Sequence, residues 1–254
     1  MGYVLGVFDF LGAVVVYVIR TLGYVFTGRL NLRLTTRQME FLGVNTIPLA
    51  VLVLSFVGAT ICYLLAEELG KRGAAGYTGG FLLVAMLREF IPVLTGVVMA
   101  GKAGAAITSE IGSMKISSQI DALRALSTDP HWFLTAPRVV ALLIMLPVVG
   151  AFAGVAGFYA GYAMVHNKIG LSYASFSSQV STFATAGDFF TCLIKCLIFG
   201  AVVAVVGCFM GYRVKGGAAG VGREVTNSVV VSIVMIFGLD LVLLPLNHWL
   251  KEIL

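Results

Sequence analysis

Residues 87–130 read LREFIPVLTGVVMAGKAGAAITSEIGSMKISSQIDALRALSTDP and decide the fold. The first half is too apolar for anything except a membrane-spanning helix, although it carries Arg88, Glu89 and Lys102. The second half turns polar without a linker and is amphipathic from Glu110 to Leu126. The stretch therefore predicts a spanning helix that continues into a short amphipathic helix, through which a membrane subunit can transmit movement to a soluble partner.

The chain as a whole is similarly apolar. Of its 254 residues, 59% are hydrophobic and 11% are charged, and the mean hydropathy is +0.99, whereas soluble domains are about a quarter charged. Backbone polar groups must be paired inside lipid, and no segment alternates like a barrel strand. We therefore expect an all-helical integral membrane protein with a single domain, residues 1–254. The net charge is +5, and the basic residues are spread over loops rather than clustered on one helix face. This distribution argues against a nucleic-acid partner.

Five apolar runs are long enough to cross a bilayer. They lie at residues 44–65, 80–107, 137–165, 189–212 and 225–246. A further apolar run at residues 1–26 is interrupted by Asp9 and Arg20, and it either crosses as a sixth span or lies in the membrane interface. We expect residues 166–187 to form a polar loop, and the glycine-rich residues 213–223 to form a turn.

The basic residues predict the orientation of these spans. A cytoplasmic amino terminus places ten lysines and arginines inside and four outside, in accord with the positive-inside rule. The inner set is Arg20, Arg29, Arg33, Arg37, Lys115, Arg124, Arg138, Arg213, Lys215 and Arg223, and the outer set is Lys71, Arg72, Lys168 and Lys251. The same orientation places residues 110–130 in the cytoplasm.

Four ionisable residues lie within the predicted spans, where a charge is costly and is usually paired and functional. They are Arg88, Glu89, Lys195 and Asp240, two positive and two negative, so they can pair across the second, fourth and fifth spans. Pro92 removes a hydrogen bond from the carbonyl of Arg88, and Pro245 does the same to Leu241. The cluster is either a set of static ion pairs that fixes helix register, or the polar part of a lipid cavity that meets a headgroup.

The amphipathic segment carries an apolar ridge at helical spacing, formed by Ile116, Ile120 and Leu123. Its other faces carry Lys115, Gln119, Asp121 and Arg124. A helix lying on lipid would place Glu110 and Asp121 near anionic headgroups, and such helices usually have a richer basic face. Docking to a soluble partner is therefore the better interpretation.

Motifs for catalysis or nucleotide binding fail on their context. Residues 96–103, GVVMAGKA, match the phosphate-binding loop except that Ala103 replaces the magnesium-binding Ser or Thr, and they lie in a membrane helix. The three histidines are far apart in the sequence, and no HExxH or G-x-S-x-G pattern is present. We therefore expect no enzymatic activity, cofactor or metal in this chain.

Small and sulfur-containing residues are expected to serve packing. The four cysteines, Cys62, Cys192, Cys196 and Cys208, all lie in apolar runs, where cysteine is typically a small buried hydrophobe. Glycine pairs with three intervening residues, at positions 150 and 154, 157 and 161, and 207 and 211, allow helices to approach closely. Such an approach could occur within the chain or between two copies.

The motifs, taken in order, resemble those of the MlaE/YrbE family, the permease subunits of ABC-type lipid transporters that work with MCE-domain proteins. The first block holds Arg88-Glu89 with Pro92, AGKAGAAITSEIG (100–112), Met114-Lys115, QIDALR (119–124) and Asp129-Pro130. The second holds Asp188, CLIK (192–195) and Phe199-Gly200, and the third holds GAAGVGREVTNSVVVS (217–232) and Asp240. The family usually has arginine where Lys102 stands, so the positive charge is kept.

The resemblance implies a permease subunit that moves lipids, with phospholipids as the expected class, between membranes. It implies an interfacial elbow helix within residues 1–40, a transmembrane bundle at 41–254 and a coupling helix at 109–130 that seats in an ATPase. The implied coupling residues are Glu110, Met114, Ile116, Ile120, Asp121, Leu123 and Arg124. The implied partners are a second permease, two ATPase subunits that bind ATP and magnesium, and a ring of MCE-domain protein, at the bacterial inner membrane.

An ion-coupled secondary transporter is the alternative, in which Glu89 or Asp240 carries a proton. The lack of a nucleotide site in this chain does not separate the two functions, because an ABC permease leaves nucleotide binding to its partner. Copurification with an ATPase, or transport that survives collapse of the ion gradient, would separate them.

Overall fold

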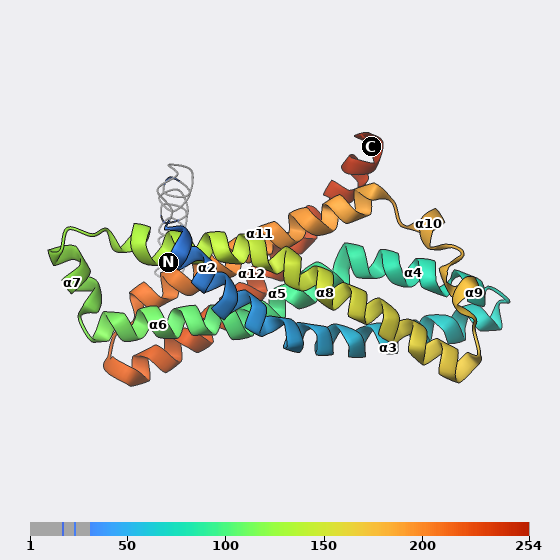
Figure 1. The fold of residues 1–254 in the computed structure, drawn as a ribbon, viewed down its shortest axis with the longest axis horizontal. Helices are drawn as coiled ribbons and strands as arrows, with labels where there is room; N and C mark the ends of the chain where they lie inside the picture. Colours follow the sequence, from blue (N-terminus) through green and yellow to red (C-terminus); the bar gives the residue numbers. More distant parts are fainter. Residues whose placement is uncertain (1–16, 18–22, 24–30, 254) are drawn as a thin grey trace, which may run out of the picture. The chain divides into compact units, whose positions relative to one another are not determined.

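The computed structural model describes Tyr17, Gly23 and residues 31–253. The predicted interfacial helix within residues 1–26 therefore lies outside the described residues, apart from those two positions. Over the described part the chain is helical and contains no strand. Figure 1 follows the order of the helices from α2 in blue to α12 in red.

Some helices are separated by short loops, whereas others continue into the next helix through a π-helical or 3-10 turn. Their bounds are α2 Leu32–Gln38, α3 Ile47–Lys71, α4 Thr78–Ala85, α5 Ile91–Met99, α6 Ala105–Ile116, α7 Gln119–Ala125, α8 Ala136–Ile169, α9 Tyr173–Ser177, α10 Val180–Phe183, α11 Ala186–Arg213 and α12 Gly217–Ile253. The π-helical turns cover Met39–Gly43, Met86–Phe90, Ala100–Gly104 and His131–Thr135.

Five continuous helical segments of the described chain are long and apolar enough to cross a membrane. They are Leu32–Lys71, Ala75–Ile116, His131–Ile169, Ala186–Arg213 and Gly217–Pro245. Each contains all or nearly all of one predicted span and extends beyond it, so the expected all-helical class with five spans is confirmed. A bilayer can accommodate helices of these lengths when the helices tilt. We expect their polar ends to lie outside the hydrocarbon core of the bilayer.

Three local predictions were wrong. The expected polar loop at 166–187 contains two short helices, α9 and α10. Ser172 caps the start of α9, because its side chain accepts a hydrogen bond from the Ser175 amide. The expected turn at 213–223 is limited to residues 214–216, because α12 already begins at Gly217. The expected amphipathic helix from Glu110 is interrupted at Ser118, whose φ of +58° ends the run between α6 and α7.

The chain divides into two compact units, each made of three segments. The first unit is Met1–Val44, Met99–Met145 and Gly200–Met235, and the second is Asn45–Val98, Leu146–Phe199 and Ile236–Leu254. All contacts described below lie inside one unit or the other.

Glycines bring helices together within each unit. In the second unit, a Cβ atom added to Gly58 of α3 would collide with the carbonyl oxygen of Gly157 in α8. In the first unit, Thr108 donates a 3.0 Å hydrogen bond to the carbonyl of Gly207, across the contact between α6 and α11. The predicted glycine spacing is therefore used for packing inside the chain. All four cysteines are buried, as expected.

Candidate functional site

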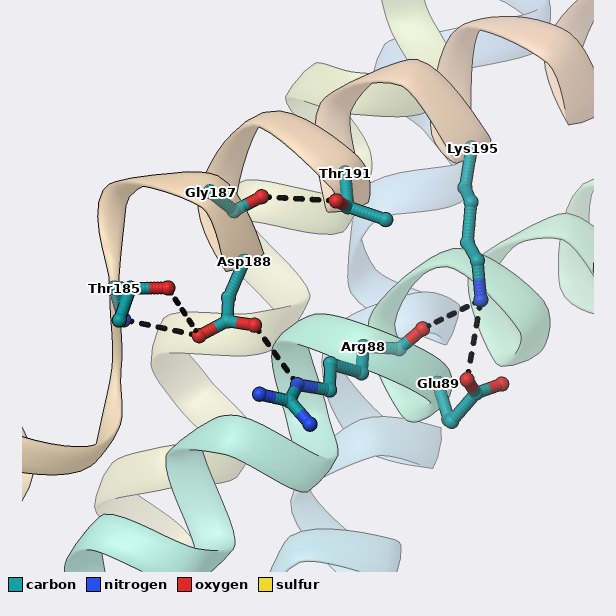
Figure 2. Close-up of polar contacts among 7 residues, drawn as sticks. All are labelled: Arg88, Glu89, Thr185, Gly187, Asp188, Thr191 and Lys195. Carbon is teal, nitrogen blue, oxygen red and sulfur yellow. Dashed lines mark hydrogen bonds and ion pairs between the residues drawn. The ribbon is translucent and has the colours of Figure 1, made fainter. Parts of the chain in front are cut away.

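The ionisable residues of the second span lie on a π-helical turn, Met86–Phe90. Pro92 follows directly, and its ring nitrogen cannot donate to the carbonyl of Arg88. That carbonyl instead accepts a 2.8 Å hydrogen bond from Nζ of Lys195 in α11 (Figure 2). A π-helical turn in a membrane helix is often found at functional sites, and here it leaves a backbone acceptor for a side chain from another span.

Lys195 is the centre of the cluster, and its side chain is only 2% exposed. Its ammonium lies 3.1 Å from Oε1 of Glu89 and 2.7 Å from Oδ1 of Asp240 in α12. The Asp240 oxygen has no partner with hydrogen-bond geometry, so this second contact is an ion pair alone. One ammonium thus joins the second, fourth and fifth spans, and it contacts both acids.

Arg88 pairs with a residue that the predicted set did not include. Its Nε donates a 2.8 Å hydrogen bond to Oδ1 of Asp188, a fully buried side chain in the first turn of α11. The second oxygen of Asp188 accepts from the amide and the hydroxyl of Thr185, at 3.0 and 2.8 Å. Figure 2 shows the carboxylate held between Thr185 on one side and the Arg88 guanidinium on the other.

The five charged side chains of this cluster do not balance when all are ionised. Arg88 and Lys195 contribute two positive charges, and Glu89, Asp188 and Asp240 contribute three negative charges. Asp188 is matched by Arg88, so Glu89 and Asp240 share the single charge of Lys195. Glu89 is the more accessible of these two acids, with 38% of its side chain exposed against 13% for Asp240.

A small apolar pocket of about 120 Å³ lies in the second unit, lined by residues of α5, α8, α11 and the π-helical turn Met86–Phe90. Its lining includes Leu87 and Phe189, the sequence neighbours of Arg88 and Asp188. The other lining residues, all apolar, are Ile91, Pro147, Ala151, Cys192, Leu193 and Cys196. The described lining carries no charged side chain, and the volume is smaller than that of a typical small-molecule site.

A partly buried ion pair lies in the first unit. Arg138, whose side chain is 7% exposed, contacts Oε2 of Glu110 at 2.7 Å and donates to the carbonyl of Leu134, also at 2.7 Å. Pro137 supplies no amide to the π-helical turn that holds Leu134. Glu110, predicted for coupling to a partner, thus joins α6 to the start of α8.

The other predicted coupling residues differ in their exposure. Ile120 is completely buried within the chain, whereas Ile116 is 43% exposed and Leu126 is 75% exposed. Met114 and Leu123 are half-buried, and Asp121 and Arg124 form an exposed pair at 3.1 Å within α7. The apolar surface available to a partner is therefore formed by Ile116, Leu123 and Leu126, and the ridge expected from spacing alone is only partly exposed.

The phosphate-loop-like motif at residues 96–103 packs on neighbouring helices through Gly96 and leaves Lys102 exposed. In the structure Gly96 faces the side chains of Ile236 and Phe199, and an added Cβ would lie 3.2 Å from Ile236. Lys102 is exposed on the π-helical turn Ala100–Gly104. Gly96 of the false phosphate-loop motif is therefore a helix-packing residue, whereas Gly101 is exposed and an added Cβ there would meet nothing within 4 Å.

Comparison with known proteins identifies similar chains over most of this length. The family model described as Permease MlaE matches residues 35–246. A probable ABC transporter permease of Synechocystis is 37% identical over 84% of this chain and 81% of its own. A probable ABC transporter permease of Rickettsia typhi is 32% identical over 82% and 80%. The chloroplastic protein TRIGALACTOSYLDIACYLGLYCEROL 1 of Arabidopsis thaliana is 33% identical over 86% of this chain and 63% of its own.

Proposed function

Because this chain belongs to the MlaE family of ABC transporter permeases, we propose that it moves lipids, with phospholipids as the expected class, between membranes. The name of the Arabidopsis relative contains that of a glycerolipid, which supports lipid as the cargo. ATP and magnesium would be bound by a separate ATPase, since the phosphate-loop-like motif at residues 96–103 lacks the Ser or Thr for magnesium and lies in a membrane helix.

The cluster around Lys195 is the observation that carries the proposal. Glu89 and Asp240 share one ammonium, so the cluster keeps an acidic group that a headgroup ammonium or hydroxyl can contact. Glu89 is the accessible member, and the exposed apolar side chains of the spanning helices offer a surface for acyl chains. A polar anchor next to an apolar surface matches the two parts of a phospholipid.

The proposed assembly contains two copies of this chain, two ATPase subunits and a ring of MCE-domain protein, in the bacterial inner membrane with a cytoplasmic amino terminus. The lipid cavity would lie between the two permeases, with walls from the first, second and fifth spans. The exposed apolar side chains of α3 and α12 support this arrangement, since Phe56, Val234 and Phe237 are each more than half exposed. ATP-driven movement would pass through α7 and its exposed neighbours.

Secondary transport with a proton on Glu89 or Asp240 is the competing function. Glu89 and Asp240 share one ammonium, so the cluster contains both of the acids that this function would use. Family membership favours ATP as the energy source. In proteoliposomes with the cognate ATPase, lipid transfer should stop on ATP depletion and continue when an ionophore collapses the proton gradient; the reverse result would establish the secondary transporter.

A set of variants tests the site itself. Lys195→Met alone should lower both thermal stability and transport, because it leaves two carboxylates without their cation. Adding Glu89→Gln and Asp240→Asn should restore stability while transport remains lost. If the triple variant transports lipid normally, the cluster is a structural ion-pair network and does not contact cargo.

A further inference from the structure

The cytoplasm-facing ends predicted for three spans form a polar pocket in the first unit, and its lining shares no residue with the Lys195 cluster. It has a volume of about 390 Å³ and is lined by residues from the end of α6, the end of α11 and the first turns of α12. Its lining is Lys115, Tyr212, Arg213, Val214, Lys215, Arg223 and Glu224. Four basic side chains against one acidic side chain give the pocket a net charge of +3, as four minus one.

The glycine-rich turn holds this pocket in shape. Gly216 and Gly217 have φ values of +85° and +71°, a backbone conformation that allows α11 to end and α12 to begin within residues 214–216. A Cβ atom added to Gly220 would collide with the carbonyl oxygen of Lys215, so the first turn of α12 packs directly on the loop. Val214 in turn packs on Gly112 of α6. The basic side chains therefore project from a tightly built backbone.

An adjoining pocket of about 350 Å³ continues from the basic one along α11 and α12. The two pockets share Arg213 and Glu224, and the second also contains Asn227 and the apolar residues Met210, Val230 and Val231. Glu224, Asn227 and Val231 are three and four residues apart, so they lie along one face of α12. Val230 is thirteen residues after the start of α12, which places it about 20 Å along the helix, within the span.

We propose that these joined pockets bind one anionic phospholipid of the surrounding membrane, with its phosphate among Lys115, Lys215 and Arg223 and an acyl chain along Met210 and Val230. Basic side chains at the ends of membrane helices attract anionic headgroups. The apolar continuation lies on spanning helices, where a membrane lipid can reach and an acidic surface of a soluble partner cannot. The site is distinct from the cluster proposed for cargo, and it would bind a resident lipid whichever direction transport takes.

The charges of the pocket favour a phospholipid whose headgroup carries hydroxyl groups next to the phosphate. Neither Lys115 nor Lys215 makes an ion pair within the described chain, and both remain available to an anion. Glu224 accepts a 3.5 Å hydrogen bond from Asn227 and lies 3.9 Å from Arg223. Its carboxylate can accept from headgroup hydroxyls while the surrounding cations contact the phosphate.

The test uses the full purified chain in detergent, with phosphatidylglycerol as the anionic probe and phosphatidylcholine as the neutral one, read by native mass spectrometry. The chain should retain phosphatidylglycerol in preference to phosphatidylcholine. A triple variant, Lys115→Gln with Lys215→Gln and Arg223→Gln, should weaken retention by at least about tenfold. The matched control is Lys71→Gln with Arg72→Gln and Lys168→Gln, which removes three exposed basic residues predicted to lie on the other membrane side and should leave retention unchanged.

Further outcomes distinguish other occupants. Val230→Gln changes a side chain that is 54% exposed and should also weaken phosphatidylglycerol retention. If Val230→Gln has no effect and millimolar inorganic phosphate displaces the lipid, the pocket binds free phosphate and the lipid assignment is wrong. Equal retention of both lipids, or unchanged retention of phosphatidylglycerol by the triple variant, would also overturn it.

Discussion

Nε of Arg88 donates a 2.8 Å hydrogen bond to Oδ1 of Asp188, and this pair joins the second membrane span to the first turn of the fourth. Asp188 has no exposed surface, whereas 34% of the Arg88 side chain is exposed. The carboxylate is also held by Thr185, through its amide and its hydroxyl. Asp188 is therefore the fixed member of the pair, and Arg88 is the member that could change partner.

Removal of Arg88 should destabilise the chain by leaving a buried carboxylate without its cation. We expect Arg88→Ala to cost about 2 kcal/mol, less than for a fully buried pair because Arg88 is partly exposed. The double variant Arg88→Ala with Asp188→Asn should recover most of that stability. Thermal unfolding of both single variants and the double variant in detergent measures the coupling, and strictly additive losses would show that the pair contributes nothing of its own.

The close approach of α3 and α8 makes a second prediction. Gly58→Ala should destabilise the chain by about 2 kcal/mol, because its Cβ would force apart two helices at the Gly157 carbonyl. Gly238→Ala in α12 is the matched control, since that glycine is exposed and an added Cβ meets nothing within 4 Å. The control should be neutral or should stabilise the helix by up to about 1 kcal/mol. Equal melting temperatures for the two variants would contradict the packing described for Gly58.

The Glu110–Arg138 pair should be structural. Arg138 contacts both the Glu110 carboxylate and the Leu134 carbonyl, a pair of contacts that the single ammonium of lysine is poorly shaped to make. We expect Arg138→Lys to lower the melting temperature clearly, and Glu110→Gln to lower it less, because the contact with Leu134 remains. Glu110→Gln should retain the ATPase in copurification; loss of the ATPase without a change in melting temperature would return Glu110 to the coupling surface.

Hydropathy alone located all five spans, because an apolar run of this length has few alternatives to a membrane helix. The side-chain partners were harder to predict. Asp188 was left between the predicted loop at 166–187 and the apolar run that begins at Phe189, although the helix already begins at Ala186. Its pairing with Arg88 joins residues a hundred positions apart, which spacing within one helix cannot indicate.

Pro92 was a better guide than periodicity. Its missing amide predicted a free carbonyl at Arg88, and the structure supplies Lys195 as the donor. Periodicity grouped Ile116, Ile120 and Leu123 as one apolar ridge, but the break at Ser118 places Ile116 in α6 and the other two in α7. Periodicity also cannot tell whether such a ridge meets the same chain or a partner. The left-handed residue Ser118 turns α7 so that Ile120 is buried and Leu126 is exposed.

This difference in exposure gives the last prediction, which tests where the ATPase docks. Leu126→Asp should abolish copurification of the ATPase while the permease keeps its melting temperature, because the side chain is 75% exposed and has little packing to lose. Ile116→Asp should act in the same direction, since Ile116 is 43% exposed. Ile120→Asp should instead unfold the segment around α7, because it places a charge at a completely buried position. Retention of the ATPase at full stoichiometry by both Leu126→Asp and Ile116→Asp would mean that the partner docks elsewhere, and that the apolar surface of α7 faces lipid.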